Sequence, residues 1–111
     1  PCGPFELYDV RAGAVACEER DPRDYGLARC SPAELAGGDA THNAVGLRAV
    51  LRGEDRGPHR DAVVLNAALA LEVAGRAAGM AEALALAAAT IDRGDSARLL
   101  ERVAAFGAAG R

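Results

Sequence analysis

The chain has 111 residues, of which 50% are apolar and 26% are charged, and its formal net charge at pH 7 is −3. This length fits one domain or part of a larger one, which can bury roughly 60–70% of its unfolded surface. All 13 basic residues are arginines, and they form no basic stripe, which argues against nucleic acid as a partner. The apolar stretch 62–74 is too short to cross a bilayer, so no membrane partner is expected.

The three cysteines, Cys2, Cys17 and Cys30, are widely spaced and form no Cys-x-x-Cys pair. An odd number of cysteines without a secretory or targeting segment predicts reduced thiols and a cytoplasmic protein. The sequence begins at Pro1, and its single methionine is Met80. The sequence thus lacks an initiator methionine, and processing and truncation explain that absence equally well.

Residues 5–10 and 14–19 predict two short strands joined by a tight turn, in which Gly13 supplies a positive φ. Phe5, Leu7, Tyr8 and Val10 are expected to face Val15 and Cys17. A lone hairpin is marginally stable in water, and no later segment offers a third strand. The hairpin in residues 1–20 is therefore expected to pair with strands outside this sequence; packing against the helices is the alternative.

Helix dominates after Ser31, where residues 31–106 predict four to five helices. Ser31, Pro32 and Glu34 have the pattern of a capping box with proline at the first helical position, opening a brief helix that Gly37 ends. Asp39 is expected to cap a second helix that runs to about Arg52. Its predicted apolar stripe consists of Ala40, Ala44, Leu47 and Leu51.

The next predicted helix, from Pro58 to about residue 74, has almost no polar face and must be covered on several sides. Asp61 is placed at the positive end of the helix dipole, and Arg60 is expected to pair with a carboxylate. An unpaired buried Asn66 would cost roughly 1–3 kcal/mol. Asn66 is therefore expected to bond the backbone of an adjacent loop, either the Gly37–Gly38 turn or the connector near Tyr25.

Two further helices complete the prediction, and each carries an apolar stripe. The stripe of the first contains Met80, Leu84, Ala87 and Ile91, widened by Ala83 and Leu86. Gly94 separates the two, and Asp95 or Ser96 is expected to cap the last helix. The stripe of the last contains Leu99, Leu100, Val103 and Phe106. The tail from Gly107 is expected to fray.

Several motifs resemble catalytic or binding sites. Residues 59–66 fit the H-R-D-x-x-x-x-N pattern of kinases, but the sequence lacks a lysine and a glycine-rich phosphate loop. Gly37–Gly38 before a helix resembles a phosphate-binding loop, but the negative charge of Asp39 would repel a phosphate at that position. A helix N-cap is therefore the favoured interpretation. His42 and His59 lack partners at metal-ligand spacing and are expected at the surface or in loops.

Glu18, Glu19, Asp21 and Asp24 form an acidic run that is typical of a solvated edge. The sequence therefore assigns no catalytic, substrate-binding or metal-binding residue. It assigns structural roles to Asp39, Asn43, Arg60, Asp61 and Asn66.

Four phrases occur in the order of one known family. They are the connector 22–27 (PRDYGL), the glycine-rich helix start 37–44 (GGDATHNA), the helix start 60–68 (RDAVVLNAA) and the closing phrase 88–97 (AATIDRGDSA). Together they resemble the C-terminal third of anthranilate phosphoribosyltransferases. The resemblance implies a segment of the glycosyltransferase-family α/β domain, an α/β fold of the nucleoside phosphorylase-like type. It also implies that the helical N-terminal domain and the phosphate-binding loops precede this sequence.

By the same resemblance, the parent enzyme transfers phosphoribosyl from phosphoribosyl pyrophosphate to anthranilate in tryptophan biosynthesis, with Mg²⁺ as cofactor and as a homodimer. This segment is expected to be structural, to bind no Mg²⁺, and to have the rest of its own polypeptide as partner. Two alternatives stay open. One is a non-catalytic relative of the same fold that acts as a binding protein; the other is a free-standing helical interaction module.

Overall fold

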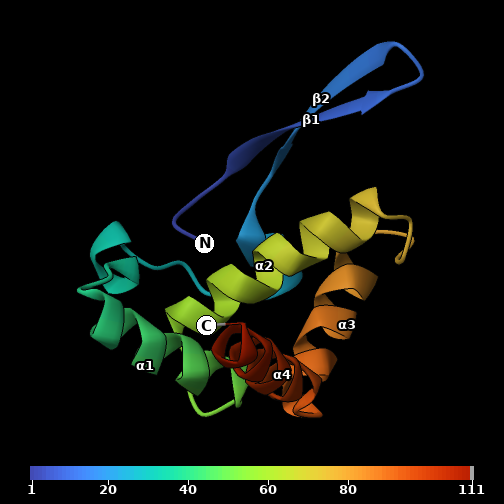
Figure 1. Cartoon of the computed structure of the whole chain (residues 1–111). Coiled ribbons are helices and arrows are strands. Elements are labelled where there is room, and N and C mark those ends of the chain that lie inside the picture. Colours follow the sequence, from blue (N-terminus) through green and yellow to red (C-terminus); the bar gives the residue numbers. More distant parts are fainter. Residues whose placement is uncertain (111) are drawn as a thin grey trace.

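The computed structural model describes residues 1–110 and consists of a β-hairpin followed by four α-helices (Figure 1). Strands β1 (Phe5–Arg11) and β2 (Ala14–Arg20) are antiparallel. Tyr8 pairs with Cys17 and Val10 with Val15, as predicted. The prediction is wrong for Phe5 and Leu7, which pair with Arg20 and Glu18. The part of the chain that the structure describes has no third strand, so the hairpin is a two-stranded sheet.

The hairpin turn contains two residues in the left-handed region, Ala12 with φ of 46° and Gly13 with φ of 80°. Positive φ at both positions matches the right-handed twist of the strands, which is why two-residue hairpin turns favour it. The expected role of Gly13 is confirmed. Ala12 adopts a conformation that costs a residue with a Cβ about 1 kcal/mol or more.

Two short 3₁₀ helices, η1 (Pro22–Tyr25) and η2 (Pro32–Leu35), connect the hairpin to the helices. At η2, Oε2 of Glu34 accepts a 2.8 Å hydrogen bond from the N–H of Ser31 and a 3.0 Å bond from its hydroxyl. These bonds hold the pKa of Glu34 below its usual value. The predicted capping residues are confirmed, although they open a single 3₁₀ turn.

The core lies between α2 (Pro58–Val73) and α3 (Met80–Asp92). Helix α2 contributes Val64, Leu65 and Ala68. Helix α3 contributes its predicted stripe, which is confirmed: Met80, Ala83, Leu84, Ala87 and Ile91 are all buried. Phe5, Tyr25 and Leu27 pack against this cluster from the hairpin and connector side.

Helix α1 (Ala40–Leu51) does not bury the stripe that its sequence predicts. Its one buried residue is Val50, at 2% exposure, whereas Leu47 is 45% exposed and Val45 is 62% exposed. The helix is protected mainly at its C-terminal turn. The predicted stripe is therefore left mostly uncovered in this helix, because most of its length has no packing partner among residues 1–110.

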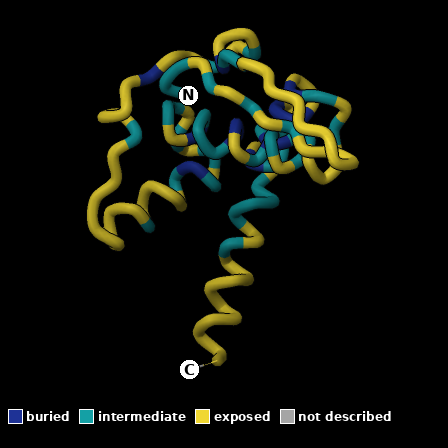
Figure 2. Tube along the Cα trace, turned by 90° about the horizontal axis from the view of Figure 1, so that it is seen from above, coloured by how far each residue is buried: buried dark blue, intermediate teal, exposed yellow. Residues whose placement is uncertain are grey.

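Helix α4 (Asp95–Ala109) has no buried residue. Val103 is 59% exposed and Phe106 is 84% exposed, and the helix projects from the rest of the structure (Figure 2). It continues to Ala109 rather than fraying from Gly107. The predicted stripe is present but uncovered, because no other element within residues 1–110 packs on the C-terminal half of the helix.

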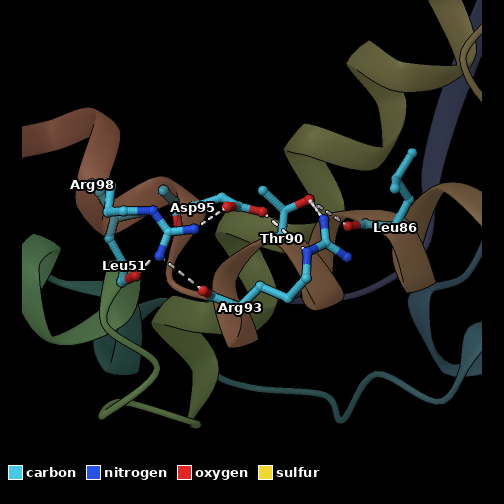
Figure 3. A network of polar contacts seen from close by, with 7 residues as sticks. Leu51, Leu86, Thr90, Arg93, Asp95 and Arg98 are labelled. Atoms are coloured by element: carbon cyan, nitrogen blue, oxygen red, sulfur yellow. Dashed lines mark hydrogen bonds and ion pairs between the residues drawn. The ribbon is translucent and has the colours of Figure 1, made fainter.

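The α3–α4 junction shows why neither predicted cap forms (Figure 3). Gly94, with φ of 76°, precedes the helix, and no side chain caps it. Asp95 instead accepts hydrogen bonds from Arg93 Nε at 3.0 Å and from Arg98. The hydroxyl of Ser96 donates to the carbonyl of Leu51 at 3.2 Å, which ties the first turn of α4 to the end of α1.

The hairpin extends away from the helices (Figure 1). Its tie to α2 is an ion pair between Arg20 Nη1 and Glu72 Oε2 at 2.6 Å. One face of the hairpin carries Tyr8, Val10 and Val15, which are 60–69% exposed. This apolar face has no cover within residues 1–110. Separately, none of the helices described is both long and apolar enough for a bilayer crossing.

Candidate functional site

The turn before α1 is held by two of the residues that the sequence singles out. Asp39 Oδ1 accepts a 2.8 Å hydrogen bond from the N–H of His42, which confirms Asp39 as the N-cap. Asn43 Oδ1 accepts from the N–H of Gly38 at 2.8 Å, and its Nδ2 donates to the carbonyl of Gly38 at 2.9 Å. The Asn43 amide thus holds the Gly37–Gly38 turn against the first turns of α1, a contact that we call the Asn43 clamp.

This clamp explains the glycine pair in physical terms. A Cβ on Gly37 would lie 2.7 Å from Oδ1 of Asn43, closer than atoms can approach. A Cβ on Gly38 would lie 3.1 Å from the ring of His42. The glycines therefore allow a close approach between the backbone and the side chains of Asn43 and His42.

Beneath this turn lies a pocket of about 320 Å³ between η2, α1 and α2, which we call the η2–α1 pocket. Its walls are mostly apolar and its polar groups are few, as in many small-molecule sites. The lining residues are Leu35, Ala36, Gly37, His42, Asn43, Gly46, Leu47, Val50, His59, Ala62 and Val63. The sequence does not predict this pocket, because it depends on how α1 crosses α2.

His42 and His59, which the sequence treats as unrelated, both line this pocket. Both are exposed, as expected. The Nδ1 of His59 lies 3.6 Å from Oδ2 of Asp55, too long for a hydrogen bond. The pocket thus combines apolar walls with two imidazoles, and no hydroxyl, thiol or carboxylate group is among its lining residues.

Arg60 forms the ion pair that the sequence predicts. Its Nη2 lies 3.1 Å from both carboxylate oxygens of Asp92 at the end of α3, which links α2 to α3. Arg60 is 8% exposed and its Nη1 is buried without a hydrogen-bond partner, whereas Asp92 is half-exposed. Arg56 reaches the same carboxylate at 3.6 Å from a mostly exposed position.

Asp61 lies in the first turn of α2, as predicted. Burial raises the pKa of this carboxyl, although the neighbouring Arg60 partly opposes that effect. The helix dipole therefore favours the charged form of Asp61, whereas burial disfavours it.

The prediction for Asn66 is wrong. Its side chain is exposed, and its Nδ2 donates at 2.8 Å to the carbonyl of Ala62 in the same helix. The asparagine that bonds the Gly37–Gly38 turn is Asn43, a contact that the sequence does not predict. The error arose from taking α2 as buried on all sides, when residues 59, 66, 70 and 73 face solvent.

The acidic residues do not fit a magnesium site. Glu18 pairs with Arg20 and Asp21 pairs with Arg23, so their charges are already matched by guanidinium groups. Within residues 1–110, no three histidine, cysteine or acidic side chains converge as metal ligands would. The Mg²⁺ that the family resemblance implies thus has no fitting ligand set in this part of the chain.

A second hollow of about 520 Å³ separates the hairpin from the C-terminal end of α2. Arg20 and Glu72 line it, together with Leu7, Tyr8 and Leu69. Arg20 and Glu72 form an ion pair with each other, so neither charge is free to bind a substrate in this hollow. The arrangement supports packing rather than chemistry, and the expectation that these residues are not catalytic stays a prediction.

Residues 1–97 match the sequence model described as "Glycosyl transferase family, a/b domain". Anthranilate phosphoribosyltransferase 2 of Streptomyces coelicolor is 50% identical over 99 residues, which cover 89% of this chain and 29% of that protein. Anthranilate phosphoribosyltransferase of Methylobacterium nodulans is 47% identical over 103 residues, covering 93% of this chain and 30% of that protein. The chain thus spans about 30% of the length of these curated relatives.

The fold agrees with that similarity. The crystal structure of anthranilate phosphoribosyltransferase from Thermus thermophilus matches with a TM-score of 0.80 at 36% identity, covering 91% of this chain and 30% of that one. The hairpin and helices described above therefore form part of an α/β fold. On these grounds the chain belongs to the glycosyl transferase family, as a segment of its α/β domain.

Proposed function

We propose that this chain is a segment of an anthranilate phosphoribosyltransferase of tryptophan biosynthesis. The whole polypeptide transfers the phosphoribosyl group of phosphoribosyl pyrophosphate to the amine of anthranilate and releases pyrophosphate. The observation that carries this proposal is identity of 47–50% to curated anthranilate phosphoribosyltransferases over about nine-tenths of the chain.

The role of this segment in that polypeptide is structural. The core between α2 and α3, the Arg60–Asp92 pair and the Asn43 clamp hold the helices together, and none of them presents a free reactive group. The apolar hairpin face of Tyr8, Val10 and Val15 supports packing against the rest of the polypeptide, because such a face is costly when it is left in water.

The reaction displaces pyrophosphate from an anomeric carbon, so catalysis requires groups that stabilise the departing negative charge. Mg²⁺ serves that purpose in the whole enzyme. Since no three histidine, cysteine or acidic side chains converge within residues 1–110, the metal ligands in this proposal come from other parts of the polypeptide. The whole enzyme is a cytoplasmic homodimer in this proposal.

The test compares two purified proteins, the whole polypeptide and the 111-residue chain alone. The loss of anthranilate fluorescence in the presence of phosphoribosyl pyrophosphate and Mg²⁺ measures transfer. We expect turnover by the whole polypeptide, none by the 111-residue chain, and restored growth of a tryptophan auxotroph by the former alone.

A folded whole polypeptide without turnover would contradict the proposed activity and favour the non-catalytic relative. Turnover by the 111-residue chain would contradict its structural role. A whole polypeptide carrying Asn66→Ala is the matched control, because Asn66 is exposed and bonds only its own helix. Its activity should equal that of the unchanged protein.

A further inference from the structure

Two of the three cysteines meet although they are far apart in the sequence. Cys2 lies just before β1, and Cys30 lies in the connector between η1 and η2. Their Sγ atoms are 3.8 Å apart, within reach of an S–H···S hydrogen bond. Both are free thiols.

The backbone holds these two thiols in place. The N–H of Cys30 donates to the carbonyl of Pro1 at 3.3 Å, so the two segments are joined next to the cysteines. Arg29 adds a second link, since its Nε donates to the carbonyl of Cys2 at 3.0 Å. Two hydrogen bonds thus join the two segments next to the sulfurs.

Access to the two sulfurs is unequal. Cys2 is half-buried, so a small solute reaches it, whereas Cys30 is 8% exposed. The third thiol, Cys17, is exposed on β2 opposite Tyr8 and has no thiol neighbour within the part of the chain described. The structure thus provides an accessible thiol, a buried partner and an exposed reference thiol.

We propose that Cys2 and Cys30 form a reversible intramolecular disulfide, with oxidised glutathione or a similar small disulfide as the oxidant. A disulfide needs the sulfurs about 2.05 Å apart, so they must approach by roughly 1.8 Å. Rotation of the two side chains about their Cα–Cβ bonds moves the sulfurs toward each other.

The reaction has two exchange steps. The Cys2 thiolate attacks one sulfur of oxidised glutathione, forms a mixed disulfide and releases one glutathione thiolate. The Cys30 thiolate then attacks Sγ of Cys2 and displaces the second glutathione thiolate. Each cysteine loses its proton, each glutathione thiolate gains one, and the two electrons of the cysteine pair reduce the glutathione disulfide.

Burial raises the pKa of the Cys30 thiol, with its contact to Cys2 adding to that effect. Because the thiolate is the attacking species, the second step should accelerate as pH rises. Closing the bond joins the start of β1 to the connector after η1, which confines the hairpin base. Reductants such as dithiothreitol reverse the reaction.

Peptide mapping tests the disulfide directly. Trypsin cleaves after Arg11, Arg20 and Arg29, so each cysteine falls on a different peptide. The whole polypeptide is incubated with oxidised glutathione, and free thiols are alkylated before digestion. We expect a linked pair of the Cys2 and Cys30 peptides, with the Cys17 peptide alkylated or carrying glutathione. Dithiothreitol should restore alkylation of both linked peptides.

Single variants separate the two steps. Cys30→Ser should leave a stable mixed disulfide with glutathione on Cys2, and Cys2→Ser should prevent any bond to Cys30. Cys17→Ser is the matched control and should leave the linked peptides unchanged. Failure to recover the linked pair while Cys17 reacts with glutathione would overturn the proposal, as would a link that includes Cys17. None of these outcomes depends on transfer to anthranilate.

Discussion

Asn43 and Asn66 place the same side chain on two helices, with different consequences. Asn43 makes two hydrogen bonds to Gly38, outside its own helix, whereas Asn66 bonds a carbonyl of its own helix. Only Asn43 therefore fixes one segment relative to another. Its exposure keeps the net value of each bond modest.

We expect Asn43→Ala to lower the free energy of unfolding by about 1–2 kcal/mol, the net value of two hydrogen bonds. Asn66→Ala should be neutral or raise it by up to about 0.5 kcal/mol, because alanine favours helix. Urea denaturation followed by circular dichroism measures both. Equal losses in the two variants would show that the clamp adds nothing.

Arg56 and Arg60 offer a second matched comparison, since both approach the carboxylate of Asp92. Arg60 is buried and Arg56 is mostly exposed. Arg60→Ala should cost about 2–3 kcal/mol, because the buried stem and one side of the ion pair are both lost. Arg56→Ala should cost less than about 0.5 kcal/mol.

The measurement is again the free energy of unfolding at low and at high salt. The Arg56→Ala effect should vanish at high salt, whereas most of the Arg60→Ala effect should persist, since lost packing is not screened. A large and salt-insensitive loss for Arg56→Ala would contradict the burial that the structure assigns to the two arginines.

At the scale of elements, the helices differ in whether their apolar stripes are covered. The stripe of α3 is buried against α2, whereas Val103 and Phe106 on α4 face solvent. Sequence periodicity predicts which face of a helix is apolar, and it predicted α3 correctly. It cannot show whether another element lies opposite that face, and within residues 1–110 the apolar residues of α1 and α4 are largely uncovered.

This difference in burial predicts that replacing a large side chain by alanine costs more stability on α3 than on α4. Leu84→Ala should lower the free energy of unfolding of the 111-residue chain by about 2–4 kcal/mol, because it opens a cavity in the core. Phe106→Ala should change it by no more than about 0.5 kcal/mol. Thermal and urea denaturation check both values. A loss for Phe106→Ala as large as that for Leu84→Ala would show that a partner covers α4 in solution.

At the scale of the whole molecule, the order of elements was predictable from the sequence because their boundaries carry strong local signals. Ser31 and Glu34, Asp39, and Gly94 mark turns and helix starts within a few residues. The η2–α1 pocket and the meeting of Cys2 with Cys30 were not predictable, since both depend on contacts between distant segments. Local propensity contains no information on such contacts.

The exposed hairpin face and the exposed end of α4 lie on different elements. Together they show that the segment does not bury all its apolar surface by itself. The relatives that it matches are about three times as long, and the remaining length of such a protein provides surfaces for this packing.

The ion pairs have a consequence for tolerance of acid and alkali. Apart from His59 with Asp55, each pair found among residues 1–110 has arginine as its cation. Guanidinium groups stay protonated to above about pH 12, so alkali does not discharge them. Acid does break the pairs, because it protonates the carboxylates.

Hydrogen bonds from Arg23 and Arg93 hold the pKa values of Asp21 and Asp95 below the usual value. Their contribution to stability is therefore present above the unfolded pKa of about 3.9 and is lost as pH falls through the lowered folded values. We expect the Tm to be nearly constant from about pH 6 to pH 9 and to fall below about pH 4. A Tm that fell equally at acidic and at alkaline pH would contradict this asymmetry. Because its cations are arginines and it has no lysine, the chain resists alkali better than acid.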